Sequence, residues 1–252
     1  MKNRKELKFL CDDRMLTVIE NRIKGVMKRD KNQTGDHYNI RSIYFDSPND
    51  RCFHENQAGV GSRVKYRIRI YEKSDALIKA EIKSKYFDTT HKESARLSKD
   101  QLAAFLQPGA LPELLGDAAG TSFLRDESDT ARKQAFETKK DIANRAILTF
   151  ANKVIGEGYR PASIVEYERN AYVFQPCNVR VTFDRNIAAS TDYDRFFAPQ
   201  LCGRCVLDAG VHILEVKYDE FLPDFLLTLL KAGDLRRTSF SKYYLSRLAL
   251  AD

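Results

Sequence analysis

The chain has 252 residues, and its 42 Lys and Arg against 35 Asp and Glu give a net charge of +7. A hydrophobic content of 43%, with 11% aromatic residues, is enough to build a folded core and excludes a disordered chain. No apolar run approaches the ~18 residues that span a bilayer, and the charged first residues lack the apolar stretch of a signal peptide. We therefore expect a cytoplasmic protein with no transmembrane segment.

The first half of the chain opens with strand-like alternation over residues 4–10. A helix is predicted over 12–28, with Asp12 or Asp13 as its cap. Four strands separated by turn-forming residues are then predicted at 37–46, 63–71, 76–85 and 89–95. Helical spacing resumes over 97–106 after a Ser98 cap, and 107–119 is expected to be a loop.

The second half begins with a charged, helix-prone segment at 130–153. Three further strands are predicted at 163–174, 178–186 and 211–219, and two closing helices at 220–232 and 238–250. There is no internal repeat or linker-like segment. We expect one α+β domain over 1–252 with a helical insertion at about 97–160.

Most of the predicted strands have one charged face and one apolar face. Because side chains alternate along a strand, Arg63, Lys65, Arg67 and Arg69 share one face, with Val64, Tyr66, Ile68 and Ile70 on the other. The same arithmetic groups the charged residues of the other strands, which are Arg4, Glu6 and Lys8; Lys79, Glu81, Lys83 and Lys85; Arg180 and Asp184; and Glu215, Lys217 and Asp219.

Two architectures are compatible with this pattern. One is an ordinary antiparallel sheet whose charged face meets water. The other is a barrel that closes around its charged faces, with helices over the apolar ones. Mixed Arg, Lys and Glu on nearly every strand favour the barrel. Many inward cations need a polyanion, and interspersed carboxylates suit a divalent metal, so phosphate chains with a metal are the expected ligands.

Eight short motifs carry a resemblance to a known family. They are Arg4-x-Glu6-x-Lys8, Ser42-Ile-Tyr-Phe-Asp46, Arg63-x-Lys65-x-Arg67-x-Arg69-x-Tyr71, Glu81-Ile-Lys83-x-Lys85, Tyr167-x-Arg169, Val179-Arg180-x-Thr-Phe-Asp184, Leu214-Glu215-Val-Lys217 and Ser241-Lys242-Tyr243. In this order they resemble the VTC domain, the polyphosphate polymerase branch of the CYTH-like triphosphate tunnel metalloenzymes. The resemblance extends from about Arg4 to Tyr243.

The resemblance implies an eight-stranded antiparallel β tunnel, a closed barrel with a charged lumen and helices packed outside. It implies an ATP-dependent phosphotransferase, a polyphosphate polymerase that adds the terminal phosphoryl group of ATP to a growing chain and releases ADP. Glu215 would hold a catalytic Mn²⁺ or Mg²⁺. Catalytic roles would fall to Arg67, Arg69, Lys83 and Lys242. The substrate would be bound by Lys8, Lys65, Tyr167, Arg169, Arg180 and Lys217, with Glu81, Lys85 and Lys92 matched by pattern alone.

One departure bears on the choice among activities. Related triphosphatases and cyclases begin with Glu-x-Glu-x-Lys, whereas Arg4 stands at the position of the first Glu. This favours the polymerase, while a triphosphatase of the same fold and a non-catalytic module that binds polyphosphate or inositol phosphates stay open. A separate membrane protein is a possible partner by the same resemblance. Nucleic-acid binding is disfavoured, because Tyr66, one of the tyrosines among the basic residues, falls on the apolar face. A metal at Cys202-x-x-Cys205 is also disfavoured, because no second ligand pair exists.

Overall fold

The structure is a computed structural model that describes residues 5–87, 89–111, 139–233 and 235–251. Within these residues the chain forms an α+β fold around one antiparallel sheet of 11 strands, ordered β11-β1-β10-β8-β7-β3-β4-β5-β6. Nine of the 11 strands follow this order, and the other two, β2 and β9, pair with β7 and β8 outside this path. The expected α+β class is confirmed.

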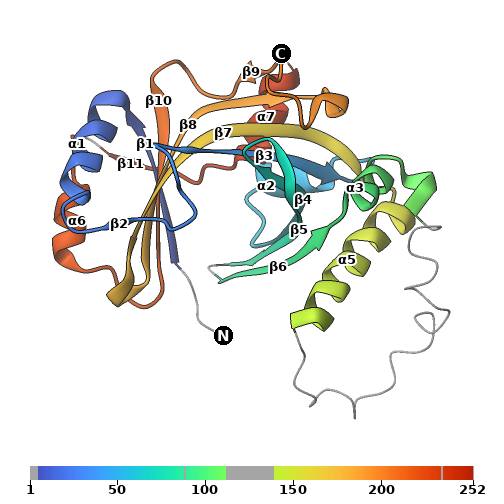
Figure 1. Cartoon of the computed structure of the whole chain (residues 1–252), viewed down its shortest axis with the longest axis horizontal. Helices are drawn as coiled ribbons and strands as arrows, with labels where there is room; N and C mark the ends of the chain where they lie inside the picture. Colours follow the sequence, from blue (N-terminus) through green and yellow to red (C-terminus); the bar gives the residue numbers. More distant parts are fainter. Residues whose placement is uncertain (1–4, 88, 112–138, 234, 252) are drawn as a thin grey trace, which may run out of the picture.

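Eight strands in the described residues have eight or more residues, and they supply nearly all of the sheet (Figure 1). These are β1 (Lys5–Asp12), β3 (Tyr38–Asp46), β4 (Ser62–Tyr71), β5 (Ser74–Tyr86), β6 (Thr89–Leu97), β7 (Arg160–Phe174), β8 (Val179–Ser190) and β10 (Val211–Tyr218). Each matches a predicted strand to within about four residues at either end. The two-residue strands are β2 (Lys28–Arg29), β9 (Arg204–Cys205) and β11 (Arg236–Arg237).

The expected closed barrel is wrong, because the sheet is open between β6 and the β1 end. The edge of β1 that would close a barrel is covered by the C-terminal segment. Phe9 and Leu10 pair with β11, and the Thr238 N–H donates to the Lys8 carbonyl at 2.9 Å. Side chains bridge the gap instead of a backbone ladder, since Lys83 Nζ on β5 donates to Glu6 Oε2 on β1 at 3.2 Å. The result is a curved sheet with a charged concave face.

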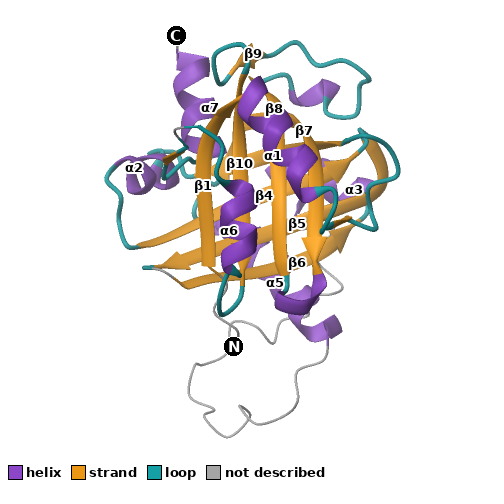
Figure 2. Cartoon of the chain, turned by 90° about the vertical axis from the view of Figure 1, so that its left-hand side faces the viewer, coloured by secondary structure: helices purple, strands orange, loops and turns teal. Residues whose placement is uncertain are grey.

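Six helices in the described residues surround the sheet, at α1 (Asp13–Ile23), α2 (Arg51–Gln57), α3 (Lys99–Leu106), α5 (Lys139–Gly156), α6 (Asp224–Leu230) and α7 (Lys242–Ala251). Helices α1 and α6 lie side by side over the outer face of β1, β10 and β8 (Figure 2). Helices α3 and α5 cover the outer face of β4, β5 and β6. The apolar half of each strand is thereby buried, which turns the charged half inward.

The caps predicted for α1 and α3 are confirmed, whereas the last helix, expected from residue 238, begins at Lys242. Helix α1 begins after Asp12, whose Oδ1 accepts from the Met15 N–H at 2.7 Å, and it ends at Ile23, earlier than expected. Helix α3 has the expected Ser98 cap, in a capping box with Gln101. Most of the expected loop at 107–119 and the start of the expected helix at 130–153 lie outside the described residues. No helix in the described part of the chain is both long and apolar enough to cross a membrane.

Candidate anion-binding site

A cavity of about 700 Å³ lies on the concave face of the sheet. Its walls come from β1, β3, β4, β5, β7 and β10, with one residue each from β6 and α2, and from the segment 237–243 that leads into α7. Among the described residues, twelve Lys and Arg side chains line the cavity: Lys5, Lys8, Arg63, Lys65, Arg67, Arg69, Lys83, Lys85, Arg169, Lys217, Arg237 and Lys242. Two carboxylates line it with them, Glu6 and Glu215. The cavity therefore carries a large excess of positive charge.

Glu81 on β5 is fully buried and holds the guanidinium groups of β4 in place. Arg67 donates from Nε to Glu81 Oε2 at 2.7 Å, and its Nη2 lies 2.7 Å from the same oxygen. Lys92 on β6 pairs with the other oxygen. Burial alone would raise the pKa of Glu81, but Arg67, Arg69 and Lys92 hold it well below its ordinary value. Glu81 thus fixes the orientation of the Arg67 guanidinium, which still lines the cavity where an anion would bind.

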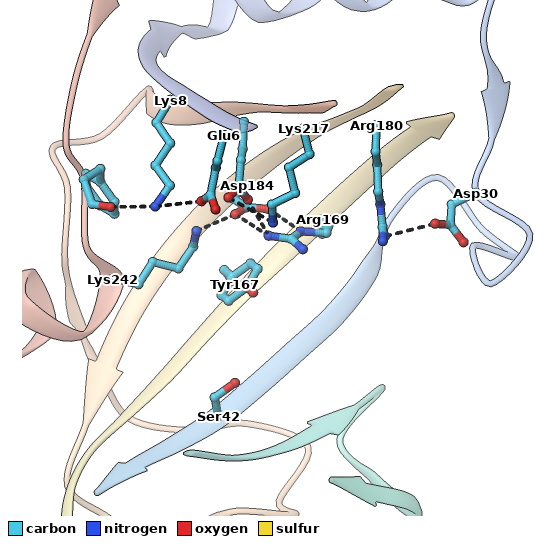
Figure 3. A network of polar contacts seen from close by, with 12 residues as sticks. Glu6, Lys8, Asp30, Ser42, Tyr167, Arg169, Arg180, Asp184, Lys217 and Lys242 are labelled. Carbon is cyan, nitrogen blue, oxygen red and sulfur yellow. Dashed lines mark hydrogen bonds and ion pairs between the residues drawn. The ribbon is translucent and has the colours of Figure 1, made fainter. Parts of the chain in front are cut away.

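A second buried carboxylate, Asp184 on β8, anchors two more cations (Figure 3). Arg169 on β7 binds it in a bidentate fork, with Nε and Nη2 at 2.6 and 2.7 Å from the two oxygens. Lys242, the first residue of α7, reaches Asp184 Oδ2 at 2.5 Å. The Lys242 ammonium also lies 4.8 Å from the centre of the Tyr167 ring, a cation–π contact. This group links the C-terminal helix to the floor of the cavity.

Glu6 on β1 and Glu215 on β10 lie on neighbouring strands, with Glu6 opposite Lys217 and Glu215 opposite Lys8, and both line the cavity. Lys8 and Lys83 pair with Glu6 at 3.1 and 3.2 Å, and Lys217 pairs with Glu215 at 3.0 Å. Burial would raise the pKa of Glu215, but Lys217, Lys8 and Arg169 keep it well below its ordinary range, so it is ionised. Burial also lowers the pKa of Lys217 to about 8, although Glu215 and Glu6 oppose this.

The residue types at this point fit a divalent metal that shares its coordination with phosphate oxygens. Mg²⁺ is commonly held by one or two carboxylates together with substrate phosphates, and Glu6 and Glu215 supply two. In the described part of the chain, no group of three His, Cys, Asp or Glu side chains could hold a metal ion by itself. The exposed Cys202 and Cys205 are therefore not joined by a third such ligand.

The structure brings ten of the eleven sequence-predicted site residues to this cavity, namely Lys8, Lys65, Arg67, Arg69, Lys83, Tyr167, Arg169, Glu215, Lys217 and Lys242. Arg180 is the exception. It turns toward Asp30, at 2.9 Å, and hydrogen-bonds the Tyr38 hydroxyl, apart from the group around Asp184 (Figure 3). Of the residues matched by pattern alone, Lys85 lines the cavity, while Glu81 and Lys92 stand behind Arg67.

Sequence reasoning gave no role to several residues that complete the site. Glu6 stands in a quoted motif, and its alternation with Lys8 was a sufficient signal that it faces the cavity. Tyr44 was also within a motif; its hydroxyl accepts from Arg67 Nη1 at 3.1 Å, and its ring stacks on Tyr243. Asp184 shares a strand face with Arg180, but its pairing with Arg169 depends on the register of β7 and β8.

Comparison with known proteins assigns the family. The VTC domain family model matches residues 3–251, nearly the whole chain, and the protein belongs to this family. No curated protein matches the sequence.

Solved structures with a similar arrangement have little sequence in common with this chain. One is a candidate adenylate cyclase from Bacillus halodurans, 11% identical, with a TM-score of 0.45 over 90% of this chain and 86% of that one. Another is a Pyrococcus horikoshii protein, 14% identical, with a TM-score of 0.46 over 99% of both chains.

Proposed function

We propose that this protein is an ATP-dependent polyphosphate polymerase that works in the cationic cavity. The observation that carries the proposal is the charge of the cavity wall, where twelve cations face two carboxylates among the described residues. A lumen of this kind is suited to a chain of phosphates, because each phosphate adds negative charge and oxygen acceptors along one line. Membership of the VTC domain family supports the same substrate class.

The reaction would break the bond between the terminal phosphorus of ATP and its bridging oxygen, and form a bond from that phosphorus to the end of a polyphosphate chain. Phosphoryl transfer depends mainly on positioning and charge neutralisation. Arg67, Arg69 and Arg169 keep their charge, and each has guanidinium N–H groups, beyond those bonded to the protein, that would donate to phosphate oxygens. Lys8, Lys83 and Lys242 offer point charges that can follow a chain as it moves. No general base is required, because the end of a polyphosphate chain is already anionic.

The carboxylates define a place for a divalent cation. Glu215, with Glu6 beside it, would hold Mg²⁺ or Mn²⁺, whose positive charge would help to neutralise the phosphates. Arg4, in place of the first acidic residue of related triphosphatases and cyclases, leaves Glu6 as the one carboxylate of the N-terminal motif. This difference supports transfer to a phosphate chain over transfer to water.

The test is a reaction of purified protein with ATP and Mn²⁺, in which polymer is detected on a gel while ADP and free phosphate are counted. A ladder of polyphosphate with ADP in excess of free phosphate is the expected result. Glu215→Gln, which keeps the shape of the side chain but removes its charge, should lose the ladder while retaining the thermal stability of a folded protein.

Two outcomes would overturn the proposal. Equal amounts of ADP and free phosphate without polymer would identify a triphosphatase. Binding of polyphosphate with no turnover under any metal would identify an accessory binding module.

A further inference from the structure

Lys65 occupies an unusual position in the cavity wall. It lies on β4 between Arg63 and Arg67 on the same strand face, and directly opposite Lys83 on β5. Its Nζ contacts the Ser241 hydroxyl oxygen at 2.7 Å. Within the described residues, no carboxylate lies within ion-pair distance of this amine, whereas Lys8, Lys83, Lys217 and Lys242 each have one.

The charged groups that face Lys65 from each neighbouring element are mostly cations: Arg63 and Arg67 on β4, Lys83 on β5, Lys8 on β1 and Lys242 at the start of α7. The nearby carboxylates form ion pairs with other cations. Glu6 pairs with Lys8 and Lys83, and Glu81 with Arg67 and Lys92. An ammonium at this point would meet repulsion from its neighbours with no compensating partner.

The contact with Ser241 is also compatible with an uncharged amine. Ser241 precedes α7, and its Oγ accepts a hydrogen bond from the Tyr244 N–H at 3.2 Å. The hydroxyl hydrogen of Ser241 is then available to donate to a lone pair on Lys65 Nζ. The positive end of α7 adds to the field against a charge here. Burial, together with Lys8, Lys83, Arg63 and Arg67, holds the pKa of Lys65 well below its ordinary value.

We propose that Lys65 is an uncharged amine in the free protein and takes up one proton when a phosphate chain enters the cavity. This rests on the proposed function only in that the ligand is a chain of phosphates; it does not depend on turnover. The negative charge of the ligand reverses the balance at Lys65 Nζ, which then becomes an ammonium that donates to phosphate oxygens. The proton comes from solvent, and no covalent bond forms or breaks.

The proposal determines how affinity changes with pH. Binding with uptake of one proton is strongest at low pH and weakens by about tenfold per pH unit through the window between the free and bound pKa of Lys65. It also makes Lys65 a selective group, because a ligand must bring enough negative charge to recruit the proton. Short or singly charged anions should therefore gain little from Lys65.

The test is calorimetric titration with tripolyphosphate in EDTA, where metal-dependent turnover is absent, at one pH in three buffers with different enthalpies of ionisation. The dependence of the observed enthalpy on the buffer gives the number of protons taken up. Wild type should take up about one proton more than Lys65→Met. Subtracting the two removes protons exchanged by tripolyphosphate or by Lys217. Lys79→Met, on β5 but outside the cavity lining, is the matched control and should keep the wild-type proton uptake.

Lys65→Arg provides a second comparison, because its guanidinium stays charged. This variant should bind tripolyphosphate without the additional proton, and it decides the question if Lys65→Met fails to bind or to fold. Equal proton uptake by wild type and by whichever of these variants binds would overturn the proposal. Failure of wild type to bind tripolyphosphate at all would overturn the proposed function and this inference with it.

Discussion

Arg41 and Ser42 are neighbours on β3, and their side chains lie on opposite faces of the sheet. The positive charges on these two faces differ in how completely the protein neutralises them. Arg41 is 1% exposed and fully satisfied: it binds Glu166 at 2.8 and 3.2 Å and donates to the carbonyls of Arg195, Phe196 and Ala198. Ser42 is fully buried on the other side of the strand, where its hydroxyl accepts from Arg69, one of the many cations that line the cavity.

The contrast separates a structural charge from a functional one. The hydrogen-bond partners of the Arg41 guanidinium all come from the protein. The guanidinium therefore holds the 193–199 loop against the sheet and needs no partner from solvent. In the cavity the protein supplies too few carboxylates for its cations. An excess of positive charge in a confined cavity costs folding free energy. A protein that keeps this excess is suited to bind an external anion that neutralises it.

The largest expected effect follows from removing a cavity cation whose neighbours stay satisfied. Lys242→Met should lower kcat/KM for ATP by about a hundredfold to a thousandfold, because charge stabilisation of the transferred phosphoryl group is lost. Asp184 keeps its bidentate Arg169, so the protein should remain folded. Steady-state kinetics checks this. Lys79→Met, on the same face of β5 but outside the cavity lining, is the control. Equal activity of both variants would contradict the assignment.

Removing the fully paired charge of Arg41 should lower stability and leave activity unchanged, the reverse of the effect expected at Lys242. Arg41→Met is expected to reduce the free energy of unfolding by about 3–5 kcal/mol, since it leaves buried carbonyls and Glu166 without their partner. The kcat/KM of the molecules that stay folded should be unchanged. Chemical denaturation, paired with kinetics at low temperature, measures both. A loss of turnover without a loss of stability would show that the two faces are not separate.

How much of this arrangement the sequence predicted depends on whether the determining contacts are local. The alternation Arg63-x-Lys65-x-Arg67 correctly placed the charged face of β4, because the period of a strand is a local property. Helix α2 was missed: its Cys52 and Phe53 N–H groups donate to Asp46, at the end of β3, at 2.8 and 3.0 Å. The predicted turn at residues 47–50 is present, but the helix that follows it is held by a residue outside it, which the local sequence does not indicate.

The one predicted site residue that does not line the cavity departs for the same reason, and its role as a phosphate ligand stays a prediction. Arg180 has the residue type and the strand face of a phosphate ligand, but the loop before β3 brings Asp30 to it. The closed barrel failed for a similar reason, because the C-terminal segment pairs with the free edge of β1 from more than 200 residues away in sequence. Such contacts depend on tertiary packing, which a periodic pattern does not encode.

A third prediction concerns the carboxylate that orients Arg67. Glu81→Gln should lower the free energy of unfolding at neutral pH by about 2 kcal/mol, because charge-assisted hydrogen bonds become neutral ones. The folded state depresses the pKa of Glu81 below its ordinary value of 4.5, so its contribution is complete above that value and is lost as pH falls below it. The gap between wild type and variant should therefore narrow in acid. A gap that is constant from neutral pH into acid would mean that Glu81 is not the ionised partner of Arg67.

The smallest expected effect is at Tyr44. Its hydroxyl accepts from Arg67, and burial, which would raise its pKa, is outweighed by Arg67, Arg69 and Lys242, so the pKa is lowered. Tyr44→Phe should weaken tripolyphosphate binding by about fivefold, the equivalent of one hydrogen bond near 1 kcal/mol. Calorimetry measures this, and the stack on Tyr243 should preserve the fold. Unchanged affinity would indicate that Arg67 needs only Glu81 for its orientation.

The most direct test of the uncompensated cavity is an experimental structure of the protein with tripolyphosphate and Mg²⁺. We expect the phosphate chain on the concave face, with its oxygens in contact with Arg67, Arg169 and Lys242 and with the metal at Glu6 and Glu215. A chain bound outside the cavity, with these cations still paired only to protein carboxylates, would contradict the account.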